Sequence, residues 1–150
     1  MLLQELSKSR RSKVKVTSKN QNYDELRRKI RAGFESAVEA YDQTNRDVIT
    51  EPRDWGSGFG VTHRSNGEVV VGGYRNIVDL GNLKRSQEYT IEESDNYAQF
   101  TWSGNGETPA VIVHEGAKLR NGNSIPARRW TEVAAREGRL AEAFKEGFDA

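Results

Sequence analysis

The stretch that decides the fold is residues 61–71, VTHRSNGEVVV, in which β-type residues with a period of two flank Asn66-Gly67. An Asn-Gly pair between two such runs favours the tight turns that join hairpin strands, because both residues tolerate a positive φ. This stretch therefore predicts an antiparallel hairpin, with Val61 and His63 on the first strand and Val69 and Val71 on the second.

Upstream of this hairpin the pattern is helical. Asn22 is followed three residues later by Glu25, a spacing typical of a capping box, so we expect a helix to begin there. Its apolar positions recur every three or four residues: Leu26, Ile30, Phe34, Ala37, Val38 and Tyr41. The pattern fades near Thr44, and Pro52 with the glycines after it predicts an irregular connection.

Downstream, Asp79 is expected to cap a short helical turn through Leu83. A second hairpin follows, in which Tyr89 and Ile91 share one face of the first strand. Residues 94–96, Ser-Asp-Asn, make its turn. The apolar residues of the return strand are Ala98, Phe100 and Trp102.

The last third of the chain predicts a short helix, a turn and a closing helix. Thr108 and Pro109 resemble the N-cap and first residue of the short helix, which Gly116 ends. Residues 121–123, Asn-Gly-Asn, fit the tip of a third hairpin. The closing helix places these apolar residues close to one face: Val133, Ala134, Leu140, Phe144 and Phe148. The expected class is α+β, a small antiparallel sheet of hairpins packed by a long N-terminal helix and a C-terminal helix.

The basic residues are concentrated at the N-terminus. Residues 1–31 contain ten Lys or Arg and three acidic residues, which gives this segment a net charge of +7. The whole chain has a net charge of +1, so the remaining residues carry −6. Residues 1–22 have few apolar side chains, and we expect a flexible basic arm there and a single α+β domain over residues 23–150. The arm could meet nucleic acid, an acidic protein surface or water, and its lack of interleaved aromatic residues weighs against base stacking.

Composition narrows the class of protein further. Only 35% of residues are hydrophobic and 30% are charged, which is lean for an isolated globule. This composition indicates that part of the chain is unpacked or packs against partners. The chain has no cysteine, which excludes disulfides and thiolate metal sites. No stretch has the pattern of a signal peptide or a membrane span, so we expect a protein that folds in the cytoplasm.

No residue pattern predicts catalysis, a cofactor or a metal ion. His63 and His114 lack the short spacing of a metal site. His114 and Glu115 are adjacent, and the sequence offers no reason for their side chains to meet. The glycines at 56, 58 and 60 lack the Lys-Ser or Lys-Thr of a phosphate-binding loop. We therefore expect a protein that is not an enzyme.

The sequence predicts different positions for the three tryptophans. We expect Trp102 in the core, whereas two roles fit Trp130: packing where the last helix meets the sheet, or contact with another subunit. Trp55 lies in a Gly-rich connection that assigns it neither role.

Residues 77–86, IVDLGNLKRS, resemble the Asp-Thr-Gly-x-Leu-x-x-Ser signature of tailed-phage neck and tail-completion proteins, with Leu80 in place of Thr. The chain is similar to this family again at residues 100–102, FTW, and 113–116, VHEG. Residues 125–130, IPARRW, complete the resemblance, with Arg129 where proline is usual. The order of these motifs extends the resemblance over roughly residues 24–148.

The resemblance implies a structural virion protein of the neck, the head–tail connector region. It implies a homo-oligomeric ring, expected to be a hexamer, between the head-closure protein and the tail terminator or tail tube. DNA would pass through the ring without sequence-specific binding, and assembly would take place in the host cytoplasm. The nearest alternative is a tail terminator protein, and an alternative of another class is a small nucleic-acid-binding module that uses the basic arm.

Within the resembling stretch, two sets of residues are singled out. The structural set joins the helices to the sheet and consists of Asp79, Gly81, Leu83, Gly116 and Pro126. The second set is expected to contact another subunit or a partner, since arginine forks can bridge carboxylates there. It consists of Lys118, Arg120, Arg128, Arg129 and Trp130.

Overall fold

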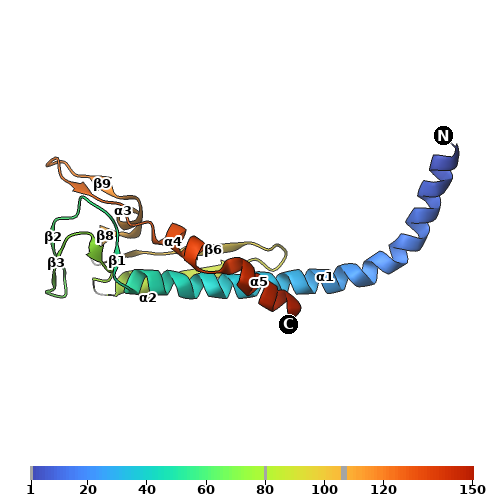
Figure 1. Cartoon of the computed structure of the whole chain (residues 1–150), viewed down its shortest axis with the longest axis horizontal. Coiled ribbons are helices and arrows are strands. Elements are labelled where there is room, and N and C mark those ends of the chain that lie inside the picture. Colours follow the sequence, from blue (N-terminus) through green and yellow to red (C-terminus); the bar gives the residue numbers. More distant parts are fainter. Residues whose placement is uncertain (1, 80, 106–107) are drawn as a thin grey trace. The chain divides into compact units, whose positions relative to one another are not determined.

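The computed structural model describes residues 2–79, 81–105 and 108–150, with the side chains of residues 2–21 and of Asn105 left out. It divides into two compact units, a central unit of Val38–Leu140 and a terminal unit of Met1–Ala37 with Ala141–Ala150. The division expected from the sequence, an arm of residues 1–22 and one domain of residues 23–150, stays a prediction. Figure 1 shows the order of the elements.

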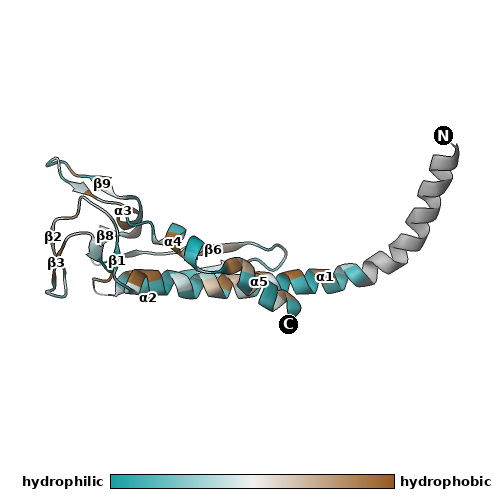
Figure 2. Ribbon diagram, viewed as in Figure 1, coloured by the Kyte–Doolittle hydropathy of each residue, from teal (hydrophilic) through white to brown (hydrophobic). Residues whose placement is uncertain are grey.

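The long helix α1 spans Leu2–Thr50, so the expected start at Asn22 is wrong, and residues 2–21 are helical where we expected an arm without regular structure. The sequence has neither proline nor glycine before Gly33, so no residue interrupts the backbone hydrogen bonds over these turns. Pro52 follows the last residue by two, which explains the end of the helix. Figure 2 shows hydrophobic residues at the C-terminal end of α1, where the central unit packs.

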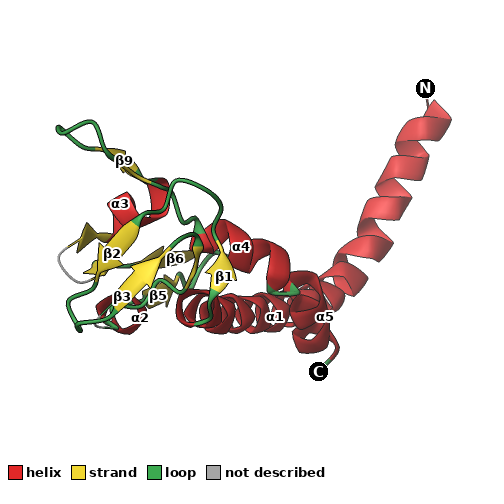
Figure 3. Cartoon of the chain, turned by 60° about the vertical axis from the view of Figure 1, so that its left-hand side comes forward, coloured by secondary structure: helices red, strands yellow, loops and turns green. Residues whose placement is uncertain are grey.

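Within the part of the chain that the structure describes, ten short strands form five separate antiparallel pairs, and Figure 3 draws strands in yellow. The predicted hairpins at residues 61–71, 89–102 and 121–123 are confirmed, and the α+β class with them. In place of one sheet, each pair is two-stranded within the described residues. The pairs are β1 Arg53–Asp54 with β4 Tyr74–Arg75, β2 Val61–His63 with β3 Val69–Val71, β5 Glu88–Ile91 with β6 Ala98–Thr101, β7 Gly104–Asn105 with β8 Thr108–Pro109, and β9 Ala117–Lys118 with β10 Ser124–Ile125.

The shorter helices are α2 Asn82–Arg85, α3 Ala110–Glu115, α4 Trp130–Glu137 and α5 Leu140–Asp149. The expectation of one closing helix is wrong, because the chain breaks between α4 and α5 at Arg139, which has a φ of 50°. Thr108 belongs to β8 and Pro109 is the N-cap of α3, one residue later than expected.

The core of the central unit joins the end of α1 to α2, α3 and α4. Its buried apolar residues are Val48, Ile49, Ile77, Leu83, Ala110, Val113, Trp130, Val133 and Ala134. Trp102 packs against them as predicted, and its indole Nε1 donates to Gln87 Oε1 at 3.0 Å. Trp55 also packs against this core, and its Nε1 donates to the carbonyl oxygen of Arg75 at 3.0 Å. Both indoles are therefore partly buried against the core, and the N–H group of each has an acceptor.

The terminal unit contains a close approach between α1 and α5. A Cβ at Gly33 would lie 2.8 Å from the carbonyl oxygen of Phe144, so only glycine allows the two backbones this spacing. Phe144 stacks on Phe148 with ring centroids 6.1 Å apart, and Lys29 Nζ lies 5.6 Å from the Phe148 centroid. Of the helices described, none has both the length and the apolar character to cross a bilayer.

Candidate functional site

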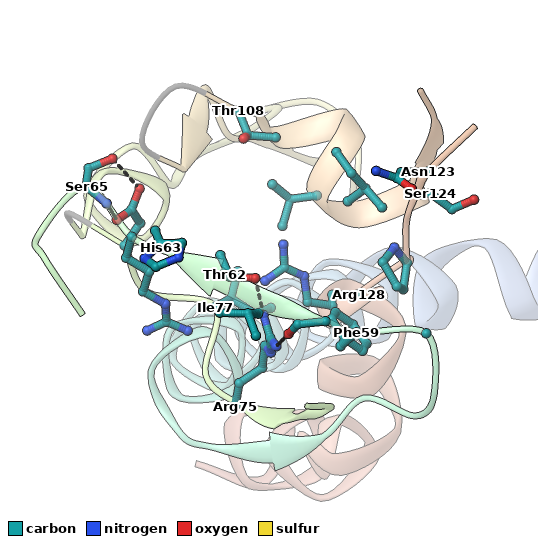
Figure 4. Close-up of a pocket in the computed structure, with 18 residues that line it drawn as sticks. Phe59, Thr62, His63, Ser65, Arg75, Ile77, Thr108, Asn123, Ser124 and Arg128 are labelled. Carbon is teal, nitrogen blue, oxygen red and sulfur yellow. Dashed lines mark hydrogen bonds between the residues drawn. The ribbon is translucent and has the colours of Figure 1, made fainter. Parts of the chain in front are cut away.

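Three arginines line a cavity of about 690 Å³ in the central unit. Arg64 follows β2, Arg75 ends β4 and Arg128 precedes α4, so distant parts of the sequence supply them. Figure 4 shows Arg75 and Arg128 beside Phe59, with the Arg128 guanidinium directed into the open space. This cavity, called here the arginine cavity, is the candidate functional site.

Arg75 is held in place by neutral acceptors. Its Nε donates to the Gly72 carbonyl at 2.7 Å, its Nη1 to Thr62 Oγ1 at 2.8 Å and its Nη2 to the Gly60 carbonyl at 3.0 Å. The side chain is 4% exposed, and burial is the main cause that lowers its pKa, with the charge of Arg64 second. These bonds fix the β2–β3 hairpin to β4 and keep a cation at the base of the cavity.

Arg64 is fixed in a similar way but has a carboxylate partner. Its Nη1 lies 3.0 Å from Glu68 Oε2 and 2.6 Å from Asn76 Oδ1, and its Nη2 donates to the Asn76 carbonyl at 2.8 Å. The side chain is 6% exposed. The Glu68 carboxylate partly neutralises this arginine, so its charge is less available to a ligand.

Arg128 differs from the other two arginines because its guanidinium has no hydrogen bond or ion pair to the described residues. Its Nε is buried and without a partner. Burial lowers the pKa of Arg128 to about 10, and the charges of Arg75 and Arg64 add to the effect. At neutral pH it is still a cation. Its Cζ lies 5.8 Å from the Phe59 ring centroid, and that of Arg75 lies 4.8 Å away.

Among the described residues that line the cavity, Asp79 is the one carboxylate. Its oxygens already accept hydrogen bonds from the β2–β3 turn. It accepts from the Ser65 backbone N–H at 2.7 Å and from Ser65 Oγ at 2.8 Å. The cavity therefore contains more positive than negative charge, which suits an oxyanion such as a carboxylate or a phosphate.

Comparison of the chain with family models, curated proteins and solved structures gives no match.

Of the five structural residues, Asp79 and Pro126 line the cavity. Asp79 was expected to cap the short helix α2, but Gly81, with a φ of 79°, is its N-cap, and the Asp79 carboxylate holds the β2–β3 turn. Leu83 is fully buried in the core. Gly116 ends α3 with a φ of 76°, and Pro126 lines the cavity directly after β10.

The five residues expected to contact partners do not form one surface. Lys118 and Arg120 are exposed on the β9–β10 hairpin. Arg129 is exposed and pairs within its own chain, with Glu115 at 3.2 Å and Glu132 at 3.4 Å. Trp130 is 1% exposed, which matches core packing, the first of its two expected roles. Arg128 belongs to the cavity.

His114 makes a contact that the sequence offers no reason to expect. Its Nδ1 lies 2.6 Å from Glu115 Oε1 and its Nε2 lies 2.6 Å from Thr131 Oγ1. The ring meets Trp130 edge-on at 4.7 Å between centroids. Both ring nitrogens are thus engaged within the chain. Among the described residues, no group of three His, Cys, Asp or Glu side chains is arranged to hold a metal ion.

Proposed function

We propose that this chain is a structural subunit of a tailed-phage virion, a neck or tail-completion protein that acts by assembling into a ring. The observation that carries the proposal is the exposed apolar face of the β2–β3 hairpin. Val61, Val69 and Val71 are 59%, 54% and 69% exposed. Val61 pairs with Val71 and His63 pairs with Val69, so these side chains share one face. A neighbouring subunit would cover this face, whereas in an isolated chain it stays in water.

The rest of the central unit supports an assembling protein. Further large apolar side chains are exposed there: Tyr74, Tyr89, Tyr97 and Leu119. In a closed ring each subunit contacts its neighbour through two different surfaces, and such contacts would bury apolar groups that a lean core leaves outside. The order of the motifs from Ile77 to Trp130 supports the neck in particular.

Electron microscopy of the purified protein, alone and mixed with phage heads or tails, tests the proposal. We expect six-fold rings, and we expect them at the junction when heads and tails are present. A protein that remains strictly monomeric and joins neither part would overturn the proposal. Rings that attach to tail tubes and never to heads would favour the tail terminator.

A nucleic-acid-binding module is the second candidate, and the observation that favours it is the helical backbone of the basic segment. Six Lys or Arg residues lie between positions 8 and 19, inside α1. Phosphate contacts would give this segment an affinity that falls steeply with salt. Deleting residues 2–21 would abolish such binding, whereas for a neck protein the deletion should mainly weaken ring formation or joining.

A further inference from the structure

Arg128 is the arginine of the cavity whose guanidinium has no hydrogen bond or ion pair to the described residues. The N–H groups of Arg75 and Arg64 are largely occupied by the Thr62 hydroxyl, by the Asn76 side chain and by backbone carbonyls. These two arginines therefore contribute positive charge to the cavity, while the guanidinium N–H groups of Arg128 remain available to a ligand. Arg128 is only partly exposed, and its buried Nε has no acceptor. A carboxylate that accepts two of its N–H groups would offset the cost of removing this cation from water.

The lining of the cavity favours a protein carboxylate over a DNA phosphate. Beside the arginines, the walls include the apolar side chains of Ile77, Val113, Ile125 and Pro126. Such walls suit the methylene groups of an acidic side chain. The phosphates of a duplex lie on a convex surface and do not enter a hollow, and the Phe59 ring already has two guanidinium groups near it where a base would stack.

A segment of opposite charge is present in the chain itself. The turn between β5 and β6 carries Glu92, Glu93 and Asp95, all of them exposed. In Figure 1 this hairpin extends away from β2, whose residues line the cavity. The turn is thus placed to reach another copy, and a contact between two different surfaces of successive copies is what a ring requires.

We propose that Arg128 binds a carboxylate of the Glu92–Asp95 turn of a neighbouring copy, so that the arginine cavity is a subunit contact of the ring. The inference rests on the proposed function. It names the residues on the two sides of one subunit contact: Arg128 in the cavity of one copy and the acidic β5–β6 turn of the next copy.

The test measures ring formation of the full chain by mass photometry and sedimentation across a range of protein and salt concentrations. We compare Arg128→Gln with a neutral-turn variant that combines Glu92→Gln, Glu93→Gln and Asp95→Asn. Each is expected to weaken ring association by at least about tenfold, in the range found when one partner of a desolvated charge pair is removed. Combining them should add little, because both remove the same interaction.

Matched controls are Arg136→Gln and Glu39→Gln, which remove one exposed charge of each sign elsewhere. Neither should change association. Urea unfolding of each variant checks the fold. If Arg128→Gln fails to fold, the neutral-turn variant decides alone, since its three changes lie on an exposed turn. A charge exchange, Arg128→Glu together with Glu93→Arg, should recover part of the association that Arg128→Glu loses.

The outcomes separate the two proposals. Rings that form equally well with the neutral-turn variant overturn the inference and leave the neck function standing. A wild-type chain that never forms rings overturns the neck function, and the inference falls with it. Binding of duplex DNA is measured in parallel, and if Arg128→Gln loses DNA affinity while its rings persist, the cavity serves a phosphate and the inference is overturned.

Discussion

At the scale of single residues, Trp130 is the largest fully buried side chain among the described residues. It is 1% exposed, and its ring packs edge-on against Trp102 at 5.7 Å and His114 at 4.7 Å between centroids. We expect Trp130→Ala to lower the free energy of unfolding by about 3–5 kcal/mol, since a large cavity replaces the indole. Urea unfolding measures this.

Two further variants make that measurement specific to burial. Trp130→Phe should cost less than Trp130→Ala, because it keeps most of the ring and removes an indole N–H that has no acceptor among the described residues. Val111→Ala, at a position 65% exposed, should stay within about 0.5 kcal/mol of wild type. A Trp130→Ala variant as stable as Val111→Ala would contradict the assignment of Trp130 to the core.

The pair of Arg53 and Glu137 predicts a small dependence of stability on pH. Both guanidinium Nη atoms bond the carboxylate, at 3.0 and 2.9 Å, and this hydrogen bonding is the main cause that lowers the pKa of Glu137. A carboxyl with a lowered pKa in the folded state stabilises the protein above its unfolded pKa. It loses that contribution as the pH falls through the folded value.

Because Glu137 is 52% exposed, solvent screening limits its contribution to about 1 kcal/mol or less. We expect Glu137→Gln to lower the free energy of unfolding at neutral pH and to match wild type well below a carboxyl pKa of about 4. Urea titrations at several pH values measure the difference. A difference that persists at the acid end would contradict the ion pair as its cause.

The arginine cavity shows which features of a site a sequence does not reveal. Arg64, Arg75 and Arg128 are up to 64 positions apart, and no local spacing links them. Arg128 was expected to bind a carboxylate because of its motif, but its burial beside two other cations depends on how β4 and the segment before α4 meet. Chemistry that depends on such long-range packing has no signature in a single sequence.

At the scale of elements, the glycine that ends α3 controls how the β9–β10 hairpin joins the unit. Gly116 has φ 76° and ψ 175°, and a Cβ there would lie 2.6 Å from the Ile125 carbonyl and 2.9 Å from the Ala127 nitrogen. We expect Gly116→Ala to cost more than about 2 kcal/mol of unfolding free energy, since backbone strain and a clash with main-chain atoms add.

Gly122 provides the matched control at the tip of the same hairpin. It also has a positive φ, of 87°, but a Cβ there would meet no atom within 4 Å. Gly122→Ala should therefore cost only the strain of about 1–2 kcal/mol. Chemical unfolding of both variants checks the order. Equal losses would show that conformational strain alone, without the close approach, explains the role of Gly116.

Elements whose signal lies in a few neighbouring residues, such as the hairpin turns, were predicted well. The start of α1 and the break between α4 and α5 depend on whether a helix continues, and these were not predicted. The Asn66-Gly67 and Asn121–Asn123 turns each define a hairpin from a few residues, and the structure has both. The capping-box spacing at Asn22 is equally local. However, a capping residue starts a helix only where the residues before it are not helical, and α1 continues through this position. The apolar spacing of the C-terminal helices continues across the break at Arg139. Gly138 is therefore the one local signal in the sequence that a helix ends there.

At the scale of the whole molecule, the neck proposal requires that the exposed apolar face of the β2–β3 hairpin be covered in the assembly. We expect the combined change Val61→Thr and Val71→Thr to weaken ring formation or joining by about tenfold or more. The shape of the side chains is kept while their apolar contact with a neighbour is reduced. The free energy of unfolding of the isolated chain should change little, because both positions are more than half exposed.

Val111→Thr is the control for this face, since it makes the same chemical change at an exposed site on α3. Mass photometry and head–tail joining in mixed extracts measure the three proteins side by side. The hairpin variant should lose association at every salt concentration, because apolar contact is little screened. The Arg128 and acidic-turn variants should differ from wild type most at low salt. A hairpin variant that forms rings and joins heads to tails as well as Val111→Thr would show that this face lies outside the subunit contacts, and the proposed function would lose the observation that carries it.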